Sequence, residues 1–219
     1  MTTTQDPADY RHSLARVREV AQELLPTFEP HCQRLMIAGS VRRRRPLVKE
    51  LEIVYVPNVD REGMYGQYEV DALAQHLEGR FRAEDRIKWG PHYKQAWVGG
   101  DQTPYLKLDL FRAEPETFGL ILALRTGPGA FSRGLVTPKP RGGYLREGHK
   151  VDNGRLWREV NWQDERDLAH LEDPETRGRL WCRIDGVTHV FHPTPEEADF
   201  FAVTSLNTPP EPINRHAGL

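Results

Sequence analysis

Apolar residues near the start of the chain recur three or four positions apart, which is the spacing of one face of an amphipathic helix. The residues of this stripe are Leu14, Val17, Ala21 and Leu24. Asp6-Pro7 lies upstream and combines a capping residue with a proline suited to the first helical position. We therefore predict that a helix begins at Asp6-Pro7 and buries this stripe.

Two later segments have strand patterns. Residues 50–57 are an apolar run that carries two glutamates at its start, and residues 105–111 alternate between apolar and polar positions. In the second segment the leucines take one face, and Lys107 and Asp109 take the other. The two segments predict two strands of a small sheet, with Asp109 on the polar face of a central strand.

The rest of the pattern predicts further helices and paired strands. The expected elements are a loop over 60–68, a helix over 70–77, an antiparallel pair over 81–98 with a turn at 99–101, a helix from Pro115 to Thr126, strand pairs over 144–158 and 180–191, and a short helix from Thr194. This order predicts an α+β fold with a small mixed sheet and helices on one face. A Pro/Gly-rich stretch at 138–143 suggests a boundary, so we expect domains over 1–138 and 139–219, the second β-rich with an insertion near 160–180.

One motif carries most of the chemical information. An apolar run ends in a Gly-Ser turn that is followed by two guanidinium groups, in the segment Ile37-Ala38-Gly39-Ser40-Val41-Arg42-Arg43. The strand with Glu50 and Glu52 follows this segment. Side chains two apart on a strand point to the same side, so the two carboxylates lie together and can hold divalent cations. The turn N–H groups, Ser40 and Arg43 can hold a triphosphate. A metal beside a triphosphate is the arrangement needed for nucleotidyl transfer.

A third carboxylate is expected on another strand, and Asp109 is the candidate. A single aspartate on a strand is more often a solvated residue than a ligand. Its combination with the Gly-Ser turn and the acidic dyad favours a catalytic role.

The motif and its spacings resemble the DNA polymerase X family. The family has Gly-Ser-x-Arg-Arg, a carboxylate dyad seven and nine residues after the second arginine, a third Asp, and a Thr-Gly turn eighteen residues after that Asp. Here Glu50 and Glu52 lie seven and nine residues after Arg43, and Gly127 lies eighteen residues after Asp109. The resemblance extends from about Leu14 to the C-terminus.

The resemblance implies a nucleotidyltransferase palm followed by a small β-rich thumb, in the minimal form found in phage or mobile-element proteins. It implies two Mg²⁺ or Mn²⁺ ions and three groups of site residues. The metal-binding and catalytic residues would be Glu50, Glu52 and Asp109; the nucleotide-binding residues would be Gly39, Ser40, Arg43, Lys49, Gly127 and Ser132; the DNA-binding residues would be Arg42, Arg133 and Arg141.

The chain departs from the family pattern at the dyad. The family has Asp-x-Asp or Asp-x-Glu preceded by glycine, whereas this chain has Glu-x-Glu preceded by Lys49. The longer side chain displaces a metal ligand, so the site is either active with shifted metal preference, slow, or silent. Leu124-Arg125 replaces the Tyr-Phe pair that helps the family to exclude ribonucleotides.

Composition limits the remaining choices. The chain has 219 residues, a net charge of −2 and two cysteines far apart, so a structural zinc site is not expected and nonspecific DNA binding should be weak. It has no apolar run long enough to span a membrane and no signal-peptide pattern, so we expect a soluble, cytoplasmic monomer.

Three functions remain open. The first is a metal-dependent DNA polymerase, acting in DNA repair or in a phage, that adds nucleotides from a nucleoside triphosphate to a DNA 3′-hydroxyl. The second is a nucleotidyltransferase that acts on RNA or on a protein hydroxyl. The third is a catalytically silent nucleic-acid-binding descendant.

Overall fold

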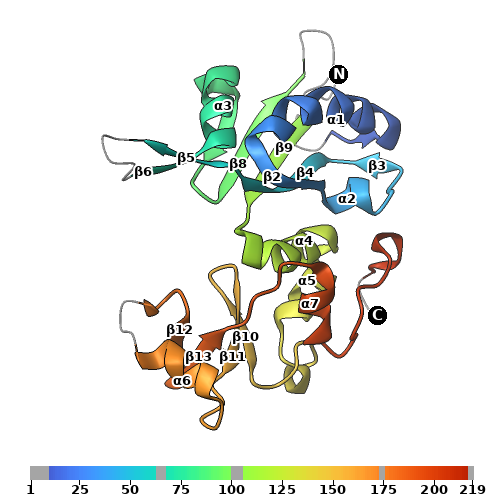
Figure 1. The fold of residues 1–219 in the computed structure, drawn as a ribbon. Coiled ribbons are helices and arrows are strands. Elements are labelled where there is room, and N and C mark those ends of the chain that lie inside the picture. Colours follow the sequence, from blue (N-terminus) through green and yellow to red (C-terminus); the bar gives the residue numbers. More distant parts are fainter. Residues whose placement is uncertain (1–9, 63–67, 100–105, 173–175, 217–219) are drawn as a thin grey trace. The chain divides into compact units, whose positions relative to one another are not determined.

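The structure, a computed structural model, describes residues 10–62, 68–99, 106–172 and 176–216. The chain folds into two compact units (Figure 1). The first unit consists of residues 1–114, 125–128 and 212–215, and the second of residues 115–124, 129–211 and 216–219. Each unit has its own hydrophobic core, and they are described in turn.

The first unit is an α+β structure. Its helices and strands are, in chain order, β1 (His12–Ser13), α1 (Leu14–Phe28), β2 (Cys32–Ile37), α2 (Gly39–Arg42), β3 (Leu47–Val48), β4 (Glu50–Pro57), β5 (Val59–Glu62), β6 (Tyr68–Asp71), α3 (Ala72–Arg80), β7 (Arg86–Trp89), β8 (Tyr93–Val98) and β9 (Leu106–Arg112). The last two residues of α4 (Phe118–Thr126) also belong to this unit.

Five of these strands form a mixed sheet in the order β2-β4-β9-β8-β7. Strands β4 and β9 are parallel at its centre, and the other neighbours are antiparallel. The predicted mixed sheet and the two predicted strands are confirmed. The parallel register places Glu52 opposite Asp109 and Glu50 opposite Lys107.

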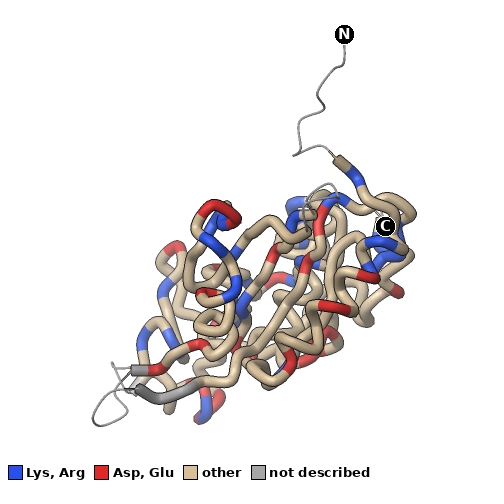
Figure 2. Tube along the Cα trace, turned by 90° about the horizontal axis from the view of Figure 1, so that it is seen from above, with Lys and Arg blue, Asp and Glu red and all other residues tan. Residues whose placement is uncertain are grey.

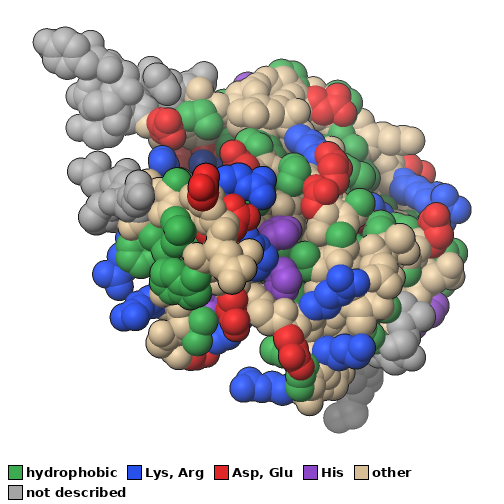
Figure 3. Space-filling view, turned by 60° about the horizontal axis from the view of Figure 1, so that its bottom comes forward, with side chains coloured by type: hydrophobic (Ala, Val, Ile, Leu, Met, Phe, Trp, Pro, Cys, Tyr) green, Lys and Arg blue, Asp and Glu red, His purple; other side chains and the backbone are tan. Residues whose placement is uncertain are grey.

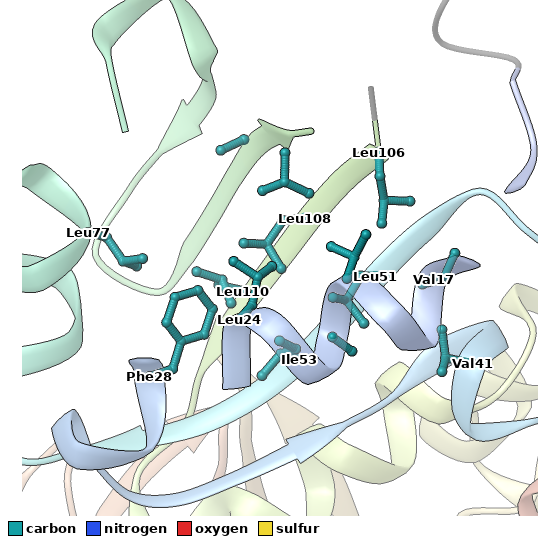
Figure 4. Close-up of a cluster of buried hydrophobic side chains, with 14 of the residues drawn as sticks. Val17, Leu24, Phe28, Val41, Leu51, Ile53, Leu77, Leu106, Leu108 and Leu110 are labelled. Atoms are coloured by element: carbon teal, nitrogen blue, oxygen red, sulfur yellow. The ribbon is translucent and has the colours of Figure 1, made fainter. Parts of the chain in front are cut away.

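One face of this sheet is apolar and is covered by α1 and α3. Leu51 and Ile53 of β4 lie on this face with Leu106, Leu108 and Leu110 of β9 (Figure 4). The helices contribute the buried residues Val17, Val20, Ala21, Leu24, Phe28, Leu73 and Leu77. Val17, Ala21 and Leu24 of the predicted stripe are therefore buried as expected, and Leu14 is partly buried. The alternation of β4 and β9 turns their polar residues to the opposite face.

Two predicted boundaries in this unit are corrected. Helix α1 begins at Leu14, because the Ser13 hydroxyl accepts a hydrogen bond from the Arg16 N–H at 3.3 Å and caps the helix there. Asp6 and Pro7 lie outside the described residues. The predicted loop over 60–68 instead contributes to a hairpin, in which β5 and β6 pair antiparallel. The connecting residues 63–67, and residues 100 and 101 of the predicted turn at 99–101, lie outside the described residues.

The second unit combines helices with a four-stranded antiparallel sheet in the order β10-β11-β13-β12. Its elements are most of α4, α5 (Gly129–Val136), β10 (His149–Asp152), β11 (Arg155–Glu159), α6 (Glu165–Glu172), β12 (Trp181–Ile184), β13 (Val187–Phe191) and α7 (Glu197–Ala202). The predicted strand pairs and the short final helix are present. The region near 160–180, expected as an insertion, contains α6.

The units do not divide at residue 138. Leu120 and Ala123 of α4 and Phe131 and Leu135 of α5 share one core with Leu145, Leu156 and the phenylalanines of α7. At Gly119 a Cβ would lie 2.1 Å from backbone atoms of Glu196, so α4 approaches the start of α7 too closely for a side chain. This packing draws residues 115–124 and 129–138 into the second unit, because their apolar faces are buried there.

Candidate active site

The polar face of the five-stranded sheet carries the predicted carboxylates in adjacent rows. Glu52, Asp109 and Gln95 lie opposite one another on β4, β9 and β8. In the next row, Glu50 lies opposite Lys107, whose Nζ is 3.9 Å from a Glu50 carboxylate oxygen. The structure thus places the three carboxylates that the sequence predicted from separate motifs on one face of the sheet.

The Gly-Ser turn lies directly against Glu52. Gly39 has φ +60°, and a Cβ built there would lie 1.6 Å from Oε2 of Glu52. The turn is fixed to the same strand by a hydrogen bond of 2.8 Å from the Ala38 N–H to the Glu52 carbonyl. Glycine is therefore required at position 39 both by the left-handed backbone and by the space that the Glu52 carboxylate takes.

Both arginines of the motif bind Thr126, the residue before Gly127. Arg42 Nη1 donates to the Thr126 hydroxyl at 2.8 Å, and Arg43 Nη1 donates to the Thr126 carbonyl. The second Nη of Arg43 lies 3.4 Å from the Ser40 hydroxyl, which accepts from it. Arg43 is only 9% exposed and Thr126 is fully buried. The arginines therefore join the Gly-Ser turn to the Thr-Gly turn, an arrangement that the sequence spacing did not reveal.

Glu52 and Asp109 of this face are hard to ionise. Burial, together with the charges of Glu50 and Asp109, raises the pKa of Glu52 to about 7, against the opposing charges of Arg43 and Arg125. Burial also raises the pKa of Asp109, which is 7% exposed. The reading of Asp109 as a solvated surface residue is thereby excluded. Half-buried Glu52 and buried Asp109, which lie opposite each other, therefore favour a cation that enters between them.

Four residues of the site were not identified from the sequence. Gln95 Nε2 donates to Asp109 Oδ1 at 2.7 Å, and the Tyr93 hydroxyl also hydrogen-bonds to Asp109. The Tyr93 ring stacks on Phe111 at a centroid distance of 4.9 Å, and the Arg125 guanidinium lies 4.0 Å from the Phe111 centroid. Tyr93 and Gln95 could have been found by extending the period-two pattern to β8, since alternate residues of an antiparallel neighbour share a face.

The donor chemistry of this face fits a divalent cation, since carboxylate oxygens are the ligands that Mg²⁺ and Mn²⁺ prefer. The side chains are not yet arranged as a metal cluster. Among the described residues, no three His, Cys, Asp or Glu side chains converge closely enough to hold an ion. Glu52 rests against Gly39 and Glu50 faces Lys107, so both would have to turn toward a bound ion.

The remaining predicted residues are Lys49 in the first unit and Ser132, Arg133 and Arg141 in the second. Lys49 precedes Glu50 and is half-buried. Ser132 belongs to the second unit, where its hydroxyl donates to the Leu124 carbonyl at 2.7 Å. Arg133 and Arg141 are exposed in the same unit. The roles suggested for these four residues stay predictions.

Charge is distributed without a marked excess of either sign. Along the chain trace, basic and acidic residues are interspersed (Figure 2), and on one face of the surface Lys and Arg side chains alternate with Asp and Glu (Figure 3). Within the described ranges, no helix combines the length and the apolarity needed to cross a bilayer.

No family model and no curated protein sequence matches the chain. The resemblance to the polymerase X family therefore depends on the motif and its spacings.

Proposed function

We propose that the protein is a nucleotidyltransferase similar to the polymerase X family, which adds nucleotides from a nucleoside triphosphate to a DNA 3′-hydroxyl. One observation carries this proposal: the Gly39 turn lies against the Glu52 carboxylate, and Glu52 lies opposite Asp109 on the neighbouring strand. A phosphate-binding turn and a pair of acids thus meet at one place. In this proposal the first unit acts as a palm and the second as a thumb.

Glu50, Glu52 and Asp109 would hold divalent ions at this site. When bound, such ions make the attacking hydroxyl more acidic and neutralise charge on the leaving pyrophosphate. Gln95 and Tyr93 hold the Asp109 carboxylate in a fixed orientation toward the polar face. Their hydrogen bonds stabilise the ionised form of Asp109, which is the form that binds a cation or accepts a hydrogen bond from the attacking group.

The Gly-Ser turn would bind the phosphate groups. In this proposal the backbone N–H groups of the turn would donate to phosphate oxygens. Arg42 and Arg43 hold this turn against Thr126, and in this proposal the adjacent Gly127 would approach the incoming nucleotide. Exposed Arg133 and Arg141 of the second unit would contact the DNA backbone in this proposal.

The proposal is tested by transfer of an α-labelled dNTP or NTP to a primer–template, with Mg²⁺ or Mn²⁺. Parallel reactions offer an RNA oligonucleotide, or the protein alone, as the acceptor. Metal-dependent labelling of the DNA primer is the expected result. Labelling of RNA or protein instead would show that the acceptor is RNA or a protein hydroxyl. No labelling of any acceptor with either metal would contradict the proposed activity.

A silent nucleic-acid-binding protein is the second candidate, and one observation favours it. The three carboxylates do not converge, and Glu50 is paired with Lys107 at 3.9 Å. In such a protein Lys107, rather than a metal ion, would neutralise the negative charge of Glu50. Replacing Lys107 with Met separates the candidates: an enzyme should keep or gain metal-dependent transfer, whereas a silent protein should remain inactive with an unaltered affinity for single-stranded DNA.

A further inference from the structure

The residue order of the motif suggests that Arg43 binds the triphosphate, but its contacts indicate a different task. Arg43 is buried, and its two Nη groups already donate to the Thr126 carbonyl and the Ser40 hydroxyl. Arg42 is engaged with the Thr126 hydroxyl, and Lys107 faces Glu50. These three cations of the first unit are thus already held by Thr126, Ser40 and Glu50.

Arg125 is placed differently. It lies in the last turn of α4, one residue before Thr126, and its side chain is exposed. Its guanidinium rests on the Phe111 ring at 4.0 Å from the centroid, and no hydrogen bond or ion pair of this side chain occurs in the described parts of the chain. Stacking on a ring orients a guanidinium while its N–H groups remain available, since the ring interacts with the face of the cation.

The position of Arg125 also suits an anionic ligand of this site. Its charge acts on both Glu52 and Asp109, so it lies near the carboxylates without forming an ion pair with either. A triphosphate that reacts beside those acids is repelled by them and needs a nearby cation. The planar fork of an arginine can bind two phosphate oxygens at once.

We propose that Arg125, held on Phe111, binds the triphosphate of the incoming nucleotide, whereas Arg43 serves to join the two turns. This inference rests on the proposed function and specifies how its substrate is held. In this proposal the contact between Arg125 and the phosphates supplies affinity for the nucleotide, and Arg43 contributes to the stability of the protein. The ring of Phe111 acts as the positioning surface, and Tyr93 stacks against that ring in turn.

Binding is measured without any acceptor, so that turnover does not contribute. The full chain is titrated with the fluorescent nucleotide mant-dATP in Mg²⁺, and inorganic triphosphate is used as the competitor. The variants are Arg125→Ala, Arg125→Lys, Arg43→Ala and the control Arg82→Ala, whose side chain is 81% exposed and pairs only loosely with Glu84 at 3.9 Å. Melting temperatures of all proteins are recorded in parallel.

Arg125→Ala should raise the Kd of mant-dATP and the inhibition constant of inorganic triphosphate about tenfold or more, with an unchanged melting temperature. Arg125→Lys should recover part of the loss, because it keeps the charge but not the stacked fork. Arg82→Ala should bind normally, and Arg43→Ala should show its main effect in the melting temperature.

Two results would overturn the inference while leaving the proposed function intact. One is wild-type affinity for mant-dATP in Arg125→Ala. The other is weaker mant-dATP binding with unchanged competition by inorganic triphosphate, which would indicate a contact to base or sugar. A wild-type protein that binds no mant-dATP at millimolar concentration would instead contradict the proposed function, and the inference with it.

Discussion

Single residues of the candidate site can meet more than one physical demand, and Gly39 shows this most clearly. Its backbone is left-handed, and its missing side chain provides the space that the Glu52 carboxylate occupies. The glycine is thus required by the strand opposite as well as by its own turn. A matched pair of substitutions separates the effect of backbone strain from the effect of the contact with Glu52.

Gly39→Ala should destabilise the protein by about 1–2 kcal/mol from backbone strain and should also abolish nucleotide transfer, because Glu52 must move. Gly142→Ala is the control, since Gly142 has φ +83° and no atom within 4 Å of an added Cβ. The control should lose similar stability and keep transfer. Denaturation curves and transfer rates of both variants test this, and equal activity in the two would contradict the placement of Glu52.

Glu52 should make the stability of the metal-free protein depend on pH. Burial raises its pKa from 4.5 to about 7, so the folded state binds this proton more tightly than the unfolded chain does. The stability that protonated Glu52 contributes to the folded state is therefore fully present below about pH 4.5 and is lost as the pH rises through 7. In EDTA, Glu52→Gln should increase the free energy of unfolding at pH 8 by roughly 1–3 kcal/mol and change it little at pH 5.

Urea denaturation of the wild type and Glu52→Gln at both pH values measures this difference. The exposed Glu84 provides the control variant Glu84→Gln, which should have no pH-dependent effect. A Glu52→Gln protein with the same stability difference at pH 5 and pH 8 would show that Glu52 titrates normally.

At the scale of elements, the site depends on a link between two turns that are far apart in the sequence. Arg43 reaches from the end of α2 to the carbonyl of Thr126, at the end of α4. Because the guanidinium is buried and charged, its hydrogen bonds contribute more than those of a neutral pair. The link therefore determines both the stability of the first unit and the position of Gly127.

Arg43→Ala should reduce the free energy of unfolding by about 2–4 kcal/mol, since it leaves the Thr126 carbonyl buried without its donor. Arg44→Ala is the neighbouring control, because Arg44 is exposed and a non-glycine residue at its φ of +56° bears the same strain. Chemical denaturation should separate the two variants. A loss of less than about 0.5 kcal/mol in Arg43→Ala would contradict the structural role of this arginine.

The elements that the sequence predicted well are those with strong apolar periodicity. Strands β4 and β9 and helix α1 bury the residues that their patterns indicated. The hairpin of β5 and β6 was missed because residues 59–71 are largely polar and alternate weakly. The Pro/Gly stretch marks a local turn, whereas the division into compact units depends on how the apolar faces of α4 and α5 pack, which a local pattern does not show.

The site was predictable in its residue types but not in its contacts. Motif spacing identified the carboxylates and the turn, but the parallel register that sets Glu52 opposite Asp109 is a long-range property of the sheet. The same limit applies to Arg125, whose position on Phe111 depends on where the end of α4 meets β9. A lone arginine near a helix end has no distinctive local pattern.

At the scale of the whole molecule, the charge balance sets how nucleic acid can be held. The net charge is −2, and acidic and basic side chains are interspersed. A protein with few phosphate contacts releases few counterions when it binds. Affinity for DNA should therefore be modest and should depend only weakly on salt.

We expect the logarithm of the DNA association constant to fall with the logarithm of salt concentration with a slope of about −2 to −4. Arg133→Ala should reduce the magnitude of this slope by about 1, as should Arg141→Ala, if each residue contacts one phosphate. Arg166→Ala, whose side chain pairs with Asp164 at 3.2 Å and is 89% exposed, is the control. Nanomolar binding to random duplex at physiological salt would reveal a larger binding surface than this account contains.

The central claim is that Glu50, Glu52 and Asp109 form one metal-dependent reacting face, and the rate of nucleotide transfer to a labelled DNA primer tests it most directly. The rate is measured in Mg²⁺ and in Mn²⁺ for the wild type, Glu50→Gln, Glu52→Gln and Asp109→Asn, with Glu84→Gln as the control. We predict a wild type that is faster in Mn²⁺, which demands less regular coordination than Mg²⁺, and a loss of at least about 10²-fold in each of the three site variants. Transfer at the wild-type rate by any folded site variant, or equal inactivity of all five proteins with both metals, would contradict the claim.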